Sequence, residues 1–154
     1  MATMNHDYHS GRVEGMWLKR SHRGPMDAVG EIRVSPDAGI VGGVDRSRRR
    51  QITLIEREVW DRLMRKLGGS ADPSARRANL LLTGIRLPNT RGRILRVGEA
   101  RLAIGGELTP CERMDEVLPG LRSAMRPDWN GGVFAQVLHD AVIRVGDDAE
   151  WETS

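Results

Sequence analysis

The chain has 154 residues and a formal net charge of +3, and these values exclude several classes of protein. The length is sufficient to bury a core in one domain without disulfides or metal. The mean hydropathy is −0.44, and no apolar run approaches the length that spans a bilayer, so we expect no membrane insertion. Aromatic residues make up only 4% of the chain and the positive charge is modest, so we expect no nucleic-acid partner.

The N-terminal sequence MATMNHDYHSGR lacks the basic and apolar regions of a secretory signal. We expect a disordered tail at residues 1–11, one domain at 12–151 and a short tail at 152–154. His6 and His9 would make a poor metal site in such a tail, because a structural zinc usually takes four ligands. The single cysteine cannot form an internal disulfide, which favours a reducing compartment and predicts a cytoplasmic protein.

Short apolar stretches separated by turn residues predict strands in the first third of the chain. One strand is expected at GMWLKRS, a second at Glu31–Val34 and a third at residues 50–55 (RQITLI). Pro and Gly residues between 35 and 43 predict tight turns. The run Arg46-Ser47-Arg48-Arg49-Arg50 has two interpretations, a solvated loop or an anion-binding segment.

The clearest helix is expected from Glu56 to Leu67. Val59, Leu63 and Leu67 recur every four residues, as on one face of an amphipathic helix. Gly68-Gly69 then provides the usual helix C-terminus. We interpret the apolar stripe as core and not as a groove for a partner.

The second half of the chain predicts further short strands. They are a buried strand at Leu80–Leu82, a hairpin over 94–104 with Gly98 in its turn, and two strands after Gly131 that turn near His139-Asp140. Helical turns are expected from Glu112 to Met125, interrupted at Pro119-Gly120. Many short strands without βαβ alternation predict a mainly β fold, a closed antiparallel β-barrel with one or two short helices.

The common catalytic signatures are missing, because the chain has no P-loop, GxGxxG, GxSxG, HExxH or CxxC. Cys111 and His139 would form a nucleophile pair only if the fold joined them, and His139 falls in a predicted turn. Pyridoxal phosphate needs a lysine for its Schiff base. Neither Lys19, on an early strand, nor Lys66, at an exposed helix end, is a convincing candidate.

Four segments, taken in order, resemble the MOSC family, the domain named after the C-terminal part of molybdenum-cofactor sulfurases. They are GIVGGVDRSRRRQITLI (39–55), RRANLLLTGI (76–85), GRILRVGEARLAIGGELTPCERMD (92–115) and GGVFAQVLHDAVIRVGDDAE (131–150). Together with the weaker GMWLKRSHRGPMDAV, they extend the resemblance over roughly residues 13–150. Within the family, the chain looks like one of the small stand-alone bacterial members.

Three groups within these segments match the pattern typical of the family. Arg77 and Asn79 form the Arg-x-Asn group ahead of the hairpin, Pro110-Cys111 the Pro-Cys pair after it, and residues 131–147 the closing strand pair. One departure is Gly43, where many members carry aspartate after the first glycine. If Asp45 does not compensate for that carboxylate, substrate choice would differ.

The resemblance implies a β-barrel like that of pyruvate kinase, with Cys111 as its functional centre. The family is linked to sulfur carried as a cysteine persulfide, to the molybdenum cofactor, and in some members to reduction of N-hydroxylated compounds. Pyridoxal phosphate is associated with the wider family.

A persulfide carrier reacts as the thiolate, which nearby positive charge favours. The candidate cations are Arg77, Arg113 and the Arg48–Arg50 cluster, and a helix starting near Glu112 would place Cys111 at its positive end. The same arrangement suits Cys111 as a molybdenum ligand, with arginine and asparagine side chains on the pterin phosphate. The candidate cofactor-binding residues are Arg77, Asn79, Thr109, Arg50 and Arg113.

Three functions remain open from the sequence. The first is a sulfur carrier loaded on Cys111 by a donor such as a cysteine desulfurase. The second is a molybdenum-dependent oxidoreductase, which would need a separate reductase. The third is a non-enzymatic module that binds an anion or metabolite, in which Cys111 is a small hydrophobe, Arg77 and Asn79 only fix a loop, and Thr109 only ends a strand.

Overall fold

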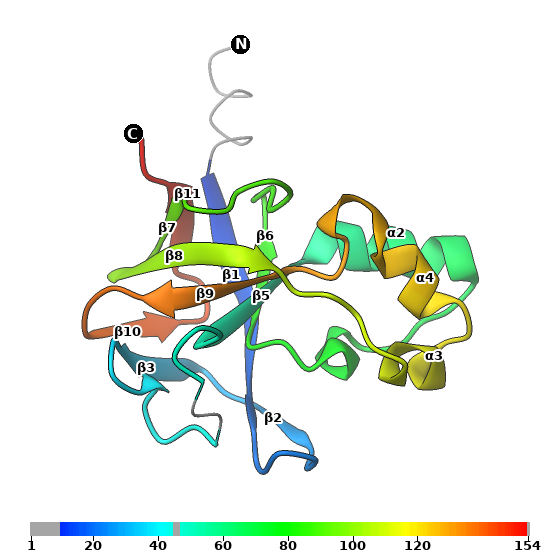
Figure 1. Ribbon diagram of the computed structural model, residues 1–154, viewed down its shortest axis with the longest axis horizontal. Helices are drawn as coiled ribbons and strands as arrows, with labels where there is room; N and C mark the ends of the chain where they lie inside the picture. The colour runs from blue at the N-terminus through cyan, green and yellow to red at the C-terminus, as the bar shows by residue number, and fades with distance from the viewer. Residues whose placement is uncertain (1–9, 45–46, 154) are drawn as a thin grey trace.

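Seven strands close into a barrel in this computed structural model, which describes residues 10–44 and 47–153 (Figure 1). The barrel strands are β1 (Ser10–Lys19), β5 (Ile52–Glu56), β6 (Leu80–Thr83), β7 (Ile94–Val97), β8 (Ala100–Glu107), β9 (Val133–Val137) and β11 (Asp148–Trp151). They follow one another in the order β11-β7-β8-β9-β5-β6-β1, and the pairing of β1 with β11 closes the ring. Because a closed sheet leaves no unpaired edge, the barrel protects its own backbone from further strand pairing.

Alternate residues of the strands fill the barrel with aliphatic side chains. In β8, for example, Leu102 and Ile104 are buried while their neighbours are half-exposed. In β5, Ile52 and Leu54 point inward, and Thr53 between them is only partly buried. This period of two places the intervening side chains on the outside, where the candidate site is built.

The predicted closed β-barrel is confirmed, with the difference that one pair of strands is parallel. Leu54 lies beside Leu80 and Glu56 beside Leu82, so β5 and β6 run in the same direction. A parallel pair needs a crossover of a dozen residues or more. Helix α2 (Arg57–Leu67) and the 3₁₀ turn η1 (Pro73–Arg76) supply that connection.

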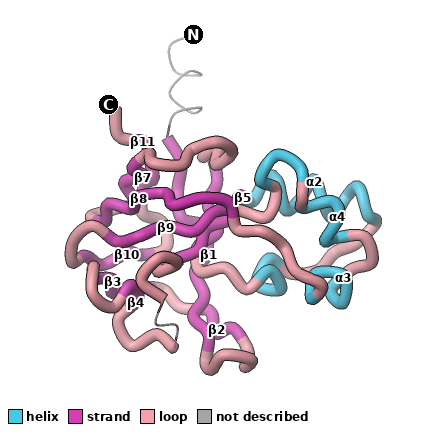
Figure 2. The backbone as a smooth tube through the Cα atoms, in the orientation of Figure 1, coloured by secondary structure: helices cyan, strands magenta, loops and turns pink. Residues whose placement is uncertain are grey.

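The helices gather on one side of the barrel (Figure 2). Helix α2 ends at Gly68, whose φ of 68° gives the left-handed C-cap that the sequence predicts. Two short helices, α3 (Arg113–Val117) and α4 (Leu121–Met125), are separated at Pro119-Gly120 as expected. The apolar face of α2 packs against them in a second buried cluster, which confirms its interpretation as core. No helix among the described residues is long and apolar enough to cross a membrane.

A small second sheet corrects the predicted pairing near the C-terminus. Strand β10 (Ala141–Arg144) pairs with β3 (Glu31–Ser35) and not with β9, and β4 (Gly39–Ile40) completes this sheet. The last segment therefore forms three strands instead of two. A short strand, β2 (Met26–Ala28), pairs with the end of β1.

The ends of the chain differ from the expected tails. Ser10 and Gly11 are the first residues of β1 and pair with β11. Glu152 donates its backbone N–H to the carbonyl of Ile94, and its carboxylate pairs with Arg101. His6, His9, Asp45 and Arg46 lie outside the described residues.

The carboxyl group of Glu56, at the end of β5, is buried beside the barrel. Its Oε2 accepts the Leu87 N–H at 3.2 Å, and the Arg86 guanidinium lies 3.9 Å from its Oε1. Burial raises the pKa of Glu56, while the Leu87 hydrogen bond and the Arg86 charge act in the opposite direction. The native state therefore binds this proton more tightly than the unfolded chain does.

We expect the Glu56 carboxyl group to make the protein less stable as the pH rises from its unfolded pKa, about 4.3, through its raised native pKa. Glu56→Gln keeps an acceptor for Leu87 but cannot ionise, so the variant should lose this part of the pH dependence. It should be more stable than wild type at neutral pH. Urea unfolding from about pH 4 to about pH 8 measures both effects. Parallel stability curves for the two proteins would contradict the prediction.

Candidate functional site

A pocket of about 210 Å³ lies outside the barrel, between β5, the turn η1 and the segment that joins β8 to α3. Five cationic side chains line it, together with Cys111, and no aspartate or glutamate is among its described lining residues. The cations are Lys19, Arg50, Arg76, Arg77 and Arg113. Such a concentration of one sign of charge raises the local concentration of anions.

Cys111 lies at the edge of this pocket and is exposed. It comes after Pro110 and two residues before helix α3, and its carbonyl accepts the Met114 N–H at 3.0 Å. The strand β8 ends at Glu107, and the Leu108 N–H then donates to the Gly132 carbonyl at 2.9 Å. The thiol therefore belongs to a loop that is fixed on both sides and is open to solvent.

Arg76 is a buried residue that holds the same loop by hydrogen bonds. Arg76 was not among the site residues predicted from the sequence. Its side chain is only 7% exposed; Nε donates to the Gly131 carbonyl at 3.0 Å and Nη2 to the Leu108 carbonyl at 2.9 Å. Burial lowers the pKa of Arg76 to about 10, and the charge on Cys111 opposes that effect. Arg76 is still protonated at neutral pH, so a buried positive charge lies beside the thiol.

The turn η1 determines which arginine reaches the loop. Asp72 caps it by accepting the Ser74 N–H, and Pro73 takes the first position, as is common at helical N-termini. Arg77 follows with φ of 65°, and its side chain points instead to the β1–β2 loop, where Nη1 donates to the Gly24 carbonyl at 2.8 Å. Asp72-Pro73 was the signal that could have predicted this turn.

Asn79 lines the pocket but uses its amide to join three strands. Its Oδ1 accepts both the N–H and the hydroxyl of Thr53, each at 3.0 Å, and Nδ2 donates to the Trp17 carbonyl at 3.2 Å. These bonds connect β5 and β1 to the start of β6. The geometry of Arg77 and Asn79 thus fits the interpretation that they fix elements beside the barrel.

The other predicted site residues divide into two groups. Arg50 and Arg113 line the pocket, and both are exposed. Arg113 forms no ion pair with any described residue. Thr109 does not line the pocket, although it lies two positions from Cys111. Gly43, where the resemblance leads us to expect aspartate, does line it, so a carboxylate there would face these cations.

The Cys111–His139 pair does not form. Strands β8 and β9 are antiparallel, and Leu102 at the start of β8 lies beside Val137 at the end of β9. His139 is therefore at the opposite end of these strands from Cys111. Asp147, near the same end, accepts the Arg144 N–H in a turn, as its position after Gly146 suggests.

Gly131 and Gly132 allow the close approach of backbone beneath the pocket. A side chain on Gly131 would meet the Leu108 carbonyl, and one on Gly132 would meet the Leu54 carbonyl.

The described residues contain no group of three or more His, Cys, Asp or Glu side chains that could hold a metal ion by themselves.

Comparison with known proteins identifies the fold. The MOSC domain matches residues 9–150. Solved structures of similar fold include YuaD from Bacillus subtilis, which is 19% identical with a TM-score of 0.80 and an alignment over 94% of this chain and 97% of that one. YiiM from Geobacillus stearothermophilus is 17% identical with a TM-score of 0.75, over 93% and 75% of the two chains. The comparison with curated proteins finds no match.

Proposed function

The chain belongs to the MOSC domain family, and from this we propose that it carries sulfur as a persulfide on Cys111. The observation that supports the proposal is the exposed thiol on a pocket with five cationic and no acidic described side chains. A thiolate, a persulfide anion and a departing thiolate are all negatively charged sulfur species. A cationic pocket stabilises each of them relative to water.

The loading step needs only a persulfide donor, such as a cysteine desulfurase. The Cys111 thiolate attacks the terminal sulfur of the donor persulfide, R–S–SH. The new Cys111 S–S bond forms as the donor S–S bond breaks, and the donor departs as the thiolate R–S⁻. The terminal sulfur keeps its proton, so no external oxidant or reductant is consumed.

The residues of the pocket have distinct parts in this proposal. Arg76 is immobilised by two carbonyls, so its charge is already oriented and costs no reorganisation when the sulfur anion forms. Arg113 is exposed at the first position of α3 and is suited to meeting the incoming donor. Cys111 is exposed, so a donor can approach it from solvent.

The test compares the sulfur carried by wild type and by two variants after incubation with a cysteine desulfurase and cysteine. We expect wild type to gain one sulfur atom that dithiothreitol removes, as seen by intact mass. Cys111→Ser should gain none. The matched control is Cys111→Ser with Thr109→Cys, which keeps one thiol in the same loop but outside the pocket, and it should load far more slowly. Equal loading of this control, or labile sulfur on Cys111→Ser, would overturn the proposal.

A second candidate is a molybdenum-cofactor-binding oxidoreductase, and the number of cations favours it. Five positive side chains exceed what one sulfur anion requires, and guanidinium groups suit the phosphate of a pterin cofactor. Arg50 and Arg113 would hold that phosphate, with Arg77 adding its charge from its place on the Gly24 carbonyl. Cys111 would supply a soft thiolate ligand. When bound, the cofactor would supply two-electron redox chemistry. Stoichiometric molybdenum in the purified protein would favour this candidate; metal-free protein that also fails to take up cofactor would exclude it.

A further inference from the structure

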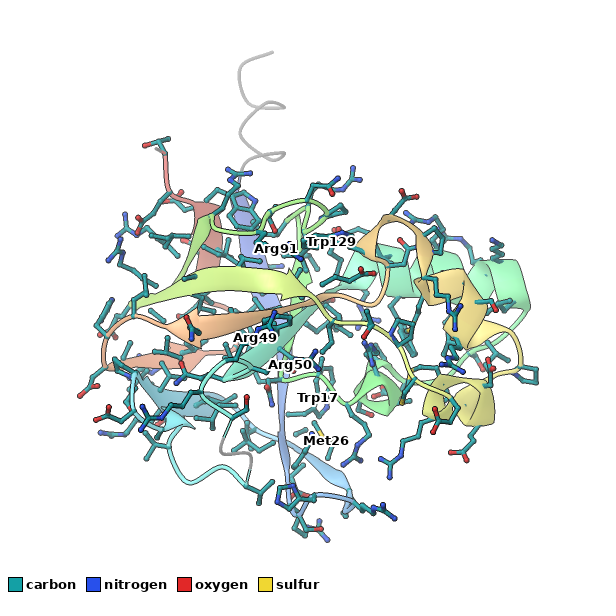
Figure 3. All side chains as sticks on the ribbon, in the orientation of Figure 1. Trp17, Met26, Arg49, Arg50, Arg91 and Trp129 are labelled. Atoms are coloured by element: carbon teal, nitrogen blue, oxygen red, sulfur yellow. The ribbon has the colours of Figure 1, made fainter. Side chains whose placement is uncertain are left out.

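Three arginines converge on one aromatic ring on the outer face of β8 and β9. The Cζ atoms of Arg49 and Arg50 lie 5.3 Å and 5.0 Å from the centre of the Phe134 ring. Arg91 reaches the same place from the other side: a Cβ atom on Gly106 would lie 3.2 Å from its Nη2 and 3.3 Å from Phe134 Cζ. We call these three side chains the arginine platform; Figure 3 labels all three, with Arg91 beside Trp129.

The platform is a built surface, because its floor, the Arg91 side chain and the backbone beside Arg49 are fixed. Gly105 and Gly106 lie at an irregularity of β8 and carry no side chain, so the Phe134 ring occupies the space above them and is only 3% exposed. Arg91 Nε donates to the Gly105 carbonyl at 3.2 Å. On the other side, Gln136 Nε2 donates to the Arg48 carbonyl at 2.9 Å, which fastens the segment that carries Arg49 and Arg50 to β9.

The positive charges of the platform have no carboxylate partner among the described residues. Arg57, Arg101 and Arg144 each pair with an aspartate or glutamate within 4.0 Å. Arg49, Arg50 and Arg91 are exposed, and none of them makes such a pair, not even with Glu107, the residue that follows Gly106 on β8. Three like charges around one ring repel one another, so an external anion would relieve that repulsion.

The surface favours carboxylates of a protein over the other common anions. A single-stranded nucleic acid is usually bound by exposed aromatic faces as well as by charge, but the Phe134 ring is covered by the arginines. A small anion would be held more firmly in the pocket than on an open surface. The platform is continuous with that pocket, because Arg50 belongs to both and Cys111 lines the pocket.

We propose that the arginine platform is the docking surface for an acidic face of the protein that exchanges sulfur with Cys111. This inference rests on the proposed sulfur-carrier function. When carboxylates of the partner bind the platform, the rest of the partner would lie over the opening of the pocket that contains Cys111. Charges at the border of an interface mainly increase the rate of association, so docking should be fast and sensitive to salt.

The first test measures binding without any sulfur chemistry. The probes are a fluorescein-labelled peptide of about ten glutamates and a labelled oligo-dT of about ten nucleotides, followed by fluorescence anisotropy at low salt. Arg49→Gln with Arg91→Gln should weaken peptide binding by roughly fivefold. The matched control, Arg33→Gln with Arg96→Gln, removes the same charge from exposed sites on β3 and β7 and should change it little.

Three results would overturn the proposal. They are no measurable binding of the peptide, equal weakening by the two double variants, and tighter binding of oligo-dT with the same dependence on Arg49 and Arg91. The last result would identify a nucleic-acid surface. None of them depends on whether Cys111 carries sulfur.

The second test connects the platform to the thiol. Bound peptide should slow the alkylation of Cys111 by a bulky neutral maleimide, and this protection should disappear in Arg49→Gln with Arg91→Gln. Peptide binding without protection would show that a ligand on the platform does not cover Cys111, and would overturn the proposal. If protection is found but the desulfurase does not load Cys111, the docking surface stands and the sulfur-carrier function fails, so the two outcomes are distinguishable.

Discussion

Arg76→Met is expected to lower the free energy of unfolding by about 3 kcal/mol, because two carbonyl groups lose their donors. Arg76 holds the Gly131 and Leu108 carbonyls from a buried position, so water cannot easily replace it. The variant no longer has to bury a charged guanidinium, which offsets part of the loss in unfolding free energy. The net loss is the cost of leaving two buried carbonyl acceptors without donors. Urea unfolding followed by tryptophan fluorescence measures the change.

The adjacent residue provides the control for Arg76. Arg77 is half-buried, and its short hydrogen bond is to the Gly24 carbonyl of the β1–β2 loop. Arg77→Met should therefore cost about 1 kcal/mol. Arg76→Lys keeps the charge but can reach only one carbonyl, so it should lie between the two. An Arg76→Met protein as stable as wild type would show that the two carbonyls find other donors.

Gly132→Ala is expected to cost about 4 kcal/mol, a large effect for a single methyl group. The φ of Gly132 is 98°, outside the range that alanine adopts comfortably. The new Cβ would also overlap the Leu54 carbonyl oxygen of β5, which is backbone and cannot rotate away. The strands β5 and β9 would have to separate just below the cationic pocket. Urea unfolding and the yield of soluble protein measure the damage.

Gly146→Ala separates the two causes of that effect. Gly146 has a similar φ of 93°, but nothing lies within 4 Å of the position where its Cβ would be. The variant should lose only the conformational part, about 1–2 kcal/mol. If both alanine variants lose the same stability, steric overlap of the Gly132 Cβ with β5 contributes nothing.

The regular elements were predictable where a local pattern determines them. The stripe of Val59 and Leu63 with Gly68 after it defines α2, and the alternation around Gly98 defines the β7–β8 hairpin. Pairing between distant strands has no such local signal. Strand β10 looks like the natural partner of β9, but it pairs with β3, because β8 and β5 already occupy both sides of β9 in the closed barrel.

The same limit applies to the candidate site. The resemblance to the MOSC family pointed to Cys111, Arg77 and Asn79, and the available cations added Arg50 and Arg113; all five residues line the pocket. Neither the resemblance nor the composition could distinguish Arg76 from Arg77, because the two are chemically identical neighbours. Asp72-Pro73 marks the turn, but the left-handed backbone at Arg77 directs the two side chains to different loops, and only the folded chain reveals those directions.

The pairing of β1 with β11 has a consequence for how the protein folds. It joins Ser10 to Glu150 and Arg12 to Asp148, residues separated by almost the whole chain. Contacts of such long range make folding slow, because the entropy of closing the intervening loop is lost before the contact forms. During synthesis the barrel cannot close until residues 148–151 have left the ribosome. Until then β1 and β7 present open edges, which makes the nascent chain dependent on protection from aggregation.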